Sequence, residues 1–161
     1  MPGMTDPSSA LQSFQIAMVS GQLSLQRGAL DHDVFLHFDQ PNNRPRFTYV
    51  RVEGSTVTAM AMFVADVPMD GKPFFDLGYA VPAAYRGQGR AKEIVAAGLA
   101  ELAKGMGRTR APSLFVQAVV GKDNAASQHV AVATISAEPT EIIDSVSGLP
   151  ALRYFHEFST T

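Results

Sequence analysis

Hydrophobic residues in the first half of the chain alternate with polar ones, the two-residue period that is typical of β-strands. Turn-forming segments rich in Gly, Pro, Asn and Asp separate these runs. The alternation predicts strands over residues 47–52, 56–64 and 74–81, with shorter strands inside 23–38, and a short apolar run predicts a first strand at 14–19. Both alternating sets of the strand at 56–64 are apolar, so we expect a central strand covered on both faces. One set is Val57, Ala59, Ala61 and Phe63, and the other is Met60, Met62 and Val64.

In the second half of the chain, apolar residues also recur at spacings of three and four residues, which is typical of helices. Residues 91–104 predict an amphipathic helix that ends near Gly105. The charged residues that fall outside its apolar stripe are Lys92, Glu93, Glu101 and Lys104. A buried strand, a second helix and a closing hairpin are predicted at 114–120, from Asn124 to about 133, and at 141–146 with 151–158. The pattern predicts one mixed α/β domain over residues 13–161, preceded by a flexible leader at residues 1–12.

Length and composition narrow the function. At 161 residues the chain is long enough for one domain and too short for two with separate cores. It contains no Cys, which excludes disulfides, thiolate metal sites and a Cys nucleophile. The net charge is −2, so we expect no nucleic-acid partner.

No membrane span, signal peptide or metal site is expected. The longest apolar run covers residues 57–67, whereas a membrane helix needs about twenty residues. The first nine residues have neither a basic nor an apolar region, so the sequence predicts a cytoplasmic protein. The cluster Asp31, His32, Asp33 and His37 matches no metal-ligand spacing.

A glycine-rich segment carries the candidate chemistry. Arg86-Gly87-Gln88-Gly89 lies between the strand that ends near Val81 and the helix that starts at Arg90. The glycines allow successive backbone amides to converge, and the helix N-terminus adds free amides and a positive dipole end. With Arg86 and Arg90 beside it, the segment predicts a diphosphate site. A Walker loop and a dinucleotide fingerprint are excluded by spacing, and a turn that merely joins strand to helix is the alternative.

At this point the sequence resembles the GCN5-related N-acetyltransferase (GNAT) superfamily. The family motif of Arg or Gln, two residues, Gly, one residue, and Gly or Ala is matched by Arg86, Gly89 and Ala91. A strand followed by Asn-x-x-Ser also matches, at 114–120 and Asn124 to Ser127. The resemblance is close over residues 74–134. Upstream of the motif, the family's Val, Pro and aromatic positions are occupied by Val81, Pro82 and Tyr85.

The resemblance implies the acyl-CoA N-acyltransferase fold, with a mostly antiparallel sheet flanked by helices. It implies that acetyl-CoA is the cosubstrate and that an amine of a small molecule or protein attacks the thioester directly. The amides of residues 87–91 would hold the CoA pyrophosphate, and the strand at 79–81 would pair with pantetheine. The residues implied in CoA binding are Val81, Arg86, Gly87, Gln88, Gly89, Arg90, Ala91, Asn124 and Ser127.

Catalysis requires a base, because the amine must lose a proton before it attacks. The resemblance makes Asp76 the candidate base, with a salt-bridged strand residue as the alternative. Tyr79 lies on the opposite face of the strand and either reaches the site or belongs to the core. The tyrosine that the family often uses to protonate the CoA thiolate is replaced by Ala131, and His129 is the candidate substitute, with an ordinary exposed histidine as the alternative.

Two departures from the family keep another function open. The missing tyrosine favours a CoA-binding sensor or interaction module on the same fold. Residues 22–46 lack the helical pattern that shapes the family's acceptor pocket, so this pocket is either open or completed by another subunit, as in a homodimer.

Overall fold

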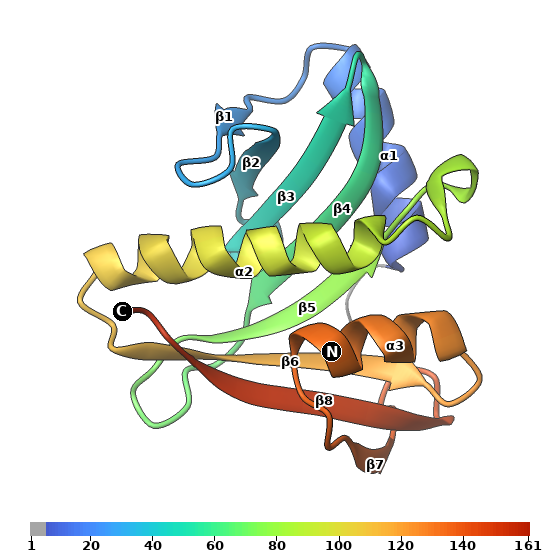
Figure 1. Ribbon diagram of the computed structural model, residues 1–161. Helices are drawn as coiled ribbons and strands as arrows, with labels where there is room; N and C mark the ends of the chain where they lie inside the picture. Colours follow the sequence, from blue (N-terminus) through green and yellow to red (C-terminus); the bar gives the residue numbers. More distant parts are fainter. Residues whose placement is uncertain (1–5) are drawn as a thin grey trace.

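The computed structural model describes residues 6–161, which form an eight-stranded sheet with helices on both faces (Figure 1). The strand order is β1-β2-β3-β4-β5-β6-β8-β7, with β5 and β6 parallel and the other neighbours antiparallel. The strands are β1 (Gln26–Arg27), β2 (Val34–Asp39), β3 (Arg46–Glu53), β4 (Thr56–Ala65), β5 (Phe74–Ala80), β6 (Ser113–Gly121), β7 (Thr140–Ile143) and β8 (Pro150–Ser159). The predicted mixed α/β fold is confirmed.

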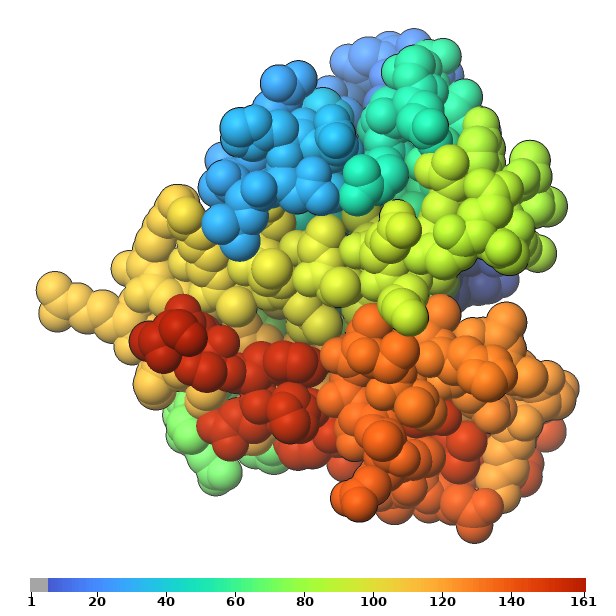
Figure 2. Space-filling view, viewed as in Figure 1, coloured from blue at the N-terminus to red at the C-terminus, as the bar shows by residue number. Residues whose placement is uncertain are grey.

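Within residues 6–161, three α-helices cover the sheet. They are α1 (Pro7–Val19), α2 (Arg90–Arg108) and α3 (Ala125–Thr134), and short 3-10 turns cover Pro41–Asn43 and Ala83–Tyr85. Helix α2 crosses one face of the central strands and α1 lies behind the opposite face (Figure 1). On the face shown in Figure 2, α2 (yellow) runs between the early strands above and α3 with the C-terminal strands below. The N-terminus of α2 therefore lies beside α3.

The prediction of a strand at residues 14–19 is wrong, because this segment belongs to α1. The Asp6 side chain accepts a hydrogen bond from the Ser8 amide at 3.2 Å, and Pro7 occupies the first helical turn, where its missing N–H costs nothing. Leu11, Phe14 and Met18 follow a helical spacing and pack on the sheet. Residues 7–12, which were predicted to form a leader, are the first half of this helix, whereas residues 1–5 of that leader lie outside the described residues.

Strand β4 is covered on both faces, as predicted, but Val57 lies on the other side. Ala59, Ala61 and Phe63 pack under α2, while Val57 joins Met60 and Met62 in the core under α1. The pairing with β3 shifts register at Arg51/Val52, so one residue is inserted before Ala59. This β-bulge reverses the side of the residues that precede it.

Helix α2 differs from the prediction in two ways. It continues past Gly105 to Arg108. Glu101, predicted on the polar side, is only 9% exposed. Its carboxylate accepts hydrogen bonds from the amides of Ala29, Leu30 and Asp31 at 2.8–2.9 Å. The buried side of α2 therefore includes one charged residue, which binds the loop between β1 and β2.

Candidate active site

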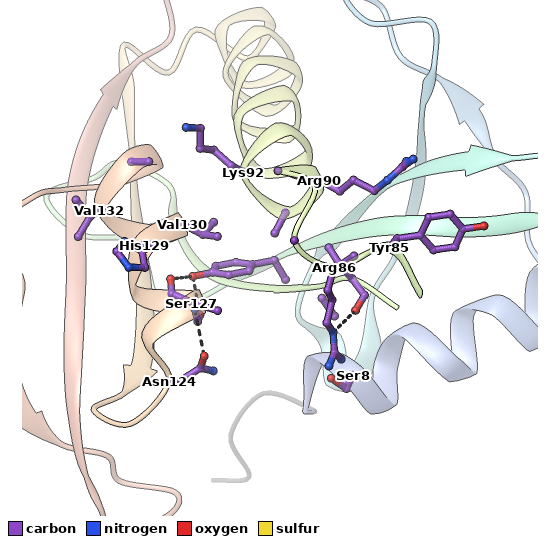
Figure 3. Close-up of a pocket in the computed structure, with 18 residues that line it drawn as sticks. Ser8, Tyr85, Arg86, Arg90, Lys92, Asn124, Ser127, His129, Val130 and Val132 are labelled. Carbon is purple, nitrogen blue, oxygen red and sulfur yellow. Dashed lines mark hydrogen bonds between the residues drawn. The ribbon is translucent and has the colours of Figure 1, made fainter. Parts of the chain in front are cut away.

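The site begins where β5 and β6 separate. These parallel strands pair at three positions, of which Asp76 with Gln117 is the last. Beyond it, β5 stays paired with β4 and β6 stays paired with β8. A cavity of about 810 Å³ lies beside the end of β5 that has left β6, bordered by the N-terminus of α2 and by α3 (Figure 3).

The glycine-rich loop borders this cavity with unpaired backbone amides. Gly87 and Gly89 have positive φ angles of 74° and 75°, which residues with a side chain rarely adopt. The first bond of α2 runs from the Glu93 amide to the Gly89 carbonyl at 3.1 Å. The amides of residues 87–92 have no acceptor among residues 6–161. The loop therefore has the open anion-binding geometry that the sequence predicts.

The two arginines beside the loop have different surroundings. The Arg86 Nε donates to the Val81 carbonyl at 2.9 Å, and the side chain points toward Ser8 at the start of α1 (Figure 3). The Arg90 Nη1 donates to Glu53 at 2.7 Å and to Thr58, the residue in the β4 bulge, at 3.2 Å. Arg90 thus anchors the start of α2 to the sheet, while Arg86 faces the cavity.

Helix α3 forms the opposite wall, and its first turn holds Tyr79. The Asn124 side chain caps the helix by accepting from the Ser127 amide at 3.1 Å. The Tyr79 hydroxyl donates to the Ser127 carbonyl at 2.7 Å and accepts from the Ser127 hydroxyl at 2.8 Å. Burial raises the pKa of Tyr79 above its usual value. His129, two residues after Ser127 in the same helix, also lines this cavity (Figure 3).

Most of the residues predicted for CoA binding line the cavity. Gln88 is not part of the lining, and its side chain accepts a hydrogen bond from Arg90 Nε at 3.3 Å. Asp76 lies outside this cavity as well. The predicted residues that do line it are Tyr79, Val81, Arg86, Gly87, Gly89, Arg90, Ala91, Asn124, Ser127 and His129.

Asp76 lines a second cavity, of about 570 Å³, which shares a wall with the first. The residues that border both cavities are Ser8, Tyr79, Asn124 and Ser127. The second cavity is also lined by Arg44 and by three further carboxylates, Asp6, Asp66 and Asp144. Of the two predicted catalytic residues of β5, Asp76 therefore lines the second cavity alone, whereas Tyr79 borders both.

Both carboxylate oxygens of Asp76 accept hydrogen bonds. Gln117 Nε2 donates to Oδ1 at 2.6 Å, and Arg44 Nη2 donates to Oδ2 at 3.0 Å. Burial raises the pKa of Asp76 above its usual value, and Asp66 adds to the rise, while the bonds from Gln117 and Arg44 oppose it. A raised pKa favours uptake of a proton by this carboxylate.

The sequence reasoning missed Arg44 and Gln117. Arg44 lies in the loop between β2 and β3, where the sequence gives no sign that it reaches β5. Gln117 had a usable signal, because it is a polar residue inside a strand that is otherwise apolar. A polar side chain that is partly buried in a sheet usually has a partner, and here the partners are Asp76 and Arg153.

Comparison with known proteins agrees with this geometry. The sequence model of the acetyltransferase (GNAT) family matches residues 17–132. This chain belongs to the GNAT acetyltransferase family. The family model covers the glycine-rich loop, both predicted catalytic residues of β5 and most of α3. No curated protein sequence matches the chain.

Solved GNAT structures share the fold. An acetyltransferase of the GNAT family from Streptococcus pneumoniae is 16% identical, with a TM-score of 0.54 and 98% of each chain covered. RimL, a ribosomal L7/L12 α-N-protein acetyltransferase solved in complex with coenzyme A, is 16% identical with a TM-score of 0.53; the match covers 72% of this chain and 64% of RimL. A GNAT-family protein from Bordetella pertussis is 19% identical with a TM-score of 0.53, covering 70% and 65%. No helix within residues 6–161 is long and apolar enough to cross a bilayer.

Proposed function

We propose that this chain is an acetyl-CoA-dependent N-acetyltransferase in which an amine attacks the thioester directly. The observation that carries the proposal is the pair of cavities that meet at Tyr79 and Ser127, one of which is bordered by the unpaired amides of residues 87–92. Two adjacent cavities suit a reaction in which a cosubstrate and an acceptor are bound together.

The first cavity would hold CoA. The amides of residues 87–91 would bind the pyrophosphate, with the positive end of the α2 dipole and the Arg86 guanidinium adding charge. Pantetheine would run along the end of β5, past Val81 and Ala80, toward the opening between β5 and β6. Asn124 and Ser127 would border it from α3. RimL, which shares the fold, was solved with coenzyme A, and this supports the assignment.

The second cavity would hold the acceptor amine. Four carboxylates and one arginine line it, so its net charge attracts an ammonium group. An amine with the pKa of lysine, about 10.4, is neutral at pH 7 in only about 0.04% of molecules, a deficit of about 4.6 kcal/mol. A base beside the amine is therefore needed.

We assign the base to Asp76 and the acid to Tyr79. The Asp76 carboxylate would take a proton from the ammonium group, directly or through water, and the freed amine would attack the acetyl carbonyl. A backbone N–H at the end of β5 would stabilise the oxyanion. As the C–S bond breaks, the Tyr79 hydroxyl would protonate the CoA thiolate. It would occupy the role of the tyrosine that Ala131 replaces, and His129 on the same cavity is the alternative donor.

A CoA-binding sensor is the second candidate function. Ala131 is fully buried where the family often places its acid, and the Tyr79 hydroxyl is hydrogen-bonded to Ser127. A sensor would bind CoA at the first cavity but would release no thiol in the presence of any amine. A cytoplasmic location and a homodimer stay predictions from the sequence.

The test combines calorimetry with a thiol-release assay. We expect CoA to bind the chain with a Kd below millimolar, and Arg86→Ala to weaken binding by about tenfold or more, because a charge-assisted phosphate contact contributes about 1.5–3 kcal/mol. Arg108→Ala, at the far end of the same helix, is the matched control and should leave the Kd unchanged. Absence of CoA binding contradicts both functions, and binding without thiol release across a panel of amines contradicts the transferase alone.

A further inference from the structure

The structure holds Asp76 at the last paired position before β5 and β6 separate. Its cross-strand neighbour at this position is Gln117. Both side chains line the second cavity, which is also where Tyr79 meets the first. The two residues therefore lie where the strands begin to separate. They are close to the part of β5 that would contact the thioester, and they line the cavity that would hold the amine.

The Gln117 amide has both of its ends occupied. Its Oε1 accepts a hydrogen bond from Arg153 Nε at 2.6 Å, and its Nε2 donates to Asp76 Oδ1 at 2.6 Å. Arg153 projects from β8, and its guanidinium lies 4.5 Å from the centre of the Phe155 ring. Because an arginine has no acceptor, its contact requires the carbonyl end of the amide and leaves the NH2 end for Asp76.

Other charged groups surround the same carboxylate. Arg44 donates to its second oxygen, and Asp66 lies 4.0 Å from the same Arg44 guanidinium. The remaining titratable groups that line the cavity are Asp6 before α1, Tyr79 on β5 and Asp144 after β7. Among these neighbours Gln117 is a neutral donor, so it stabilises the ionised carboxylate without cancelling its charge.

We propose that Gln117, oriented by Arg153, is a positioning residue that holds the Asp76 carboxylate at the mouth of the opening so that it faces the acceptor amine. The proposal rests on the proposed function. In the reaction, the nitrogen of the ammonium loses two protons, the N–C bond forms, and the C–S bond breaks with its electron pair on sulfur. One proton ends on the thiol and one in solvent, and Asp76 carries the first of them away from the nitrogen.

The first test is the pH profile of thiol release at saturating acetyl-CoA. Activity should rise with pH as Asp76 loses its proton, which gives the profile a rising limb. Gln117→Leu should move this limb to higher pH by about half a unit to one unit, because the ionised Asp76 carboxylate loses a hydrogen-bond donor. Gln117→Glu adds a like charge and should move the limb further, by about one unit or more. Arg153→Ala should give a smaller shift in the same direction, because the amide loses only its orientation.

The matched control is Gln128→Leu. Gln128 donates to the carbonyls of Gly121 and Lys122 at the end of β6, so its loss removes comparable bonds without contact to Asp76. An unchanged limb in Gln117→Leu, or an equal shift in Gln128→Leu, overturns the proposal. The KM for acetyl-CoA should change less than twofold in all these variants.

A second measurement does not depend on activity. The Asp76 carboxyl carbon, followed by NMR through a pH titration, should titrate at higher pH in Gln117→Leu and Gln117→Glu than in the parent chain. Equal titration curves overturn the inference even if the enzyme is active. A parent chain that releases no thiol contradicts the proposed function instead, and the titration then still decides whether Gln117 controls this carboxylate.

Discussion

Two groups of converging backbone amides lie beside α2, one next to Glu101 in its C-terminal half and the other at its N-terminus. In the loop between β1 and β2, the amides of residues 29–31 donate to the buried Glu101 carboxylate. In the loop before α2 and in the first turn of this helix, the amides of residues 87–92 converge beside a cavity and have no partner among the described residues. The first group binds an anion that the chain supplies, and the second leaves the place of the anion open.

The difference shows that converging backbone amides can stabilise the fold in one place and bind a ligand in another. At the closed group, a Cβ on Gly28 would lie 2.4 Å from the Asp31 carbonyl oxygen and 2.8 Å from Glu101 Oε2, so the loop fits around its own carboxylate. At the open group, a Cβ on Gly87 or Gly89 would meet nothing within 4 Å. Empty space beside unpaired donors is the arrangement that an external anion requires.

The largest effect is expected at the closed group. Glu101→Ala should lower the free energy of unfolding by about 3 kcal/mol, because it leaves three amides in a partly buried loop without their charged acceptor. Urea denaturation measures the change. Glu93→Ala, which removes an exposed carboxylate from the same helix, is the control and should cost less than about 1 kcal/mol. Equal losses in the two variants would mean that Glu101 does not stabilise the loop.

A smaller stability effect with a large binding effect is expected at the open group. Gly89→Ala places a side chain at a φ of 75° and should cost about 1 kcal/mol of stability while weakening CoA about tenfold, because the added methyl group enters the ligand space. Gly21→Ala, at a φ of 72° after α1 and equally free of contacts, is the matched control. It should lose similar stability and keep the parent Kd in calorimetry. A tenfold loss in both variants would show that strain alone explains the result.

The smallest effect is expected from inorganic pyrophosphate. At about three times its Kd, a ligand of the folded state stabilises it by about 0.8 kcal/mol, which corresponds to a few degrees in Tm for a chain of this size. Differential scanning calorimetry should show this shift in the parent chain and in Arg108→Ala, and a reduced shift in Gly89→Ala. A shift that persists in Gly89→Ala would place the anion elsewhere, and the open group would then lose its assigned role.

The open group could be predicted from sequence, whereas the closed one could not. Glycines before a helical stripe are a local pattern, and local patterns fix a turn and a helix start. Glu101 falls outside the apolar stripe of α2, and only the tertiary position of residues 29–31 makes it a buried acceptor. The sequence contains no signal for a contact across seventy positions.

The same distinction separates the correct and incorrect parts of the fold prediction. Strands with strong alternation, such as β4, and the helix with the clearest stripe were placed correctly, and β4 failed only at Val57, where a bulge breaks the two-residue period. Residues 14–19 are apolar without a period that separates strand from helix, and the cap that decides in favour of a helix lies eight residues earlier at Asp6. Asp76 was identified by resemblance, but its partners Gln117 and Arg44 come from distant elements.

The wall that Tyr79 and Ser127 form between the two cavities has a consequence for how reactants enter and products leave. The connection after β7 borders only the second cavity and the start of α2 borders only the first, so each reactant would enter from a different side. Under the proposed function, CoA and the acetylated product could therefore leave from different cavities. The acetyl group would pass directly from one cavity to the other, with no covalent acyl-enzyme.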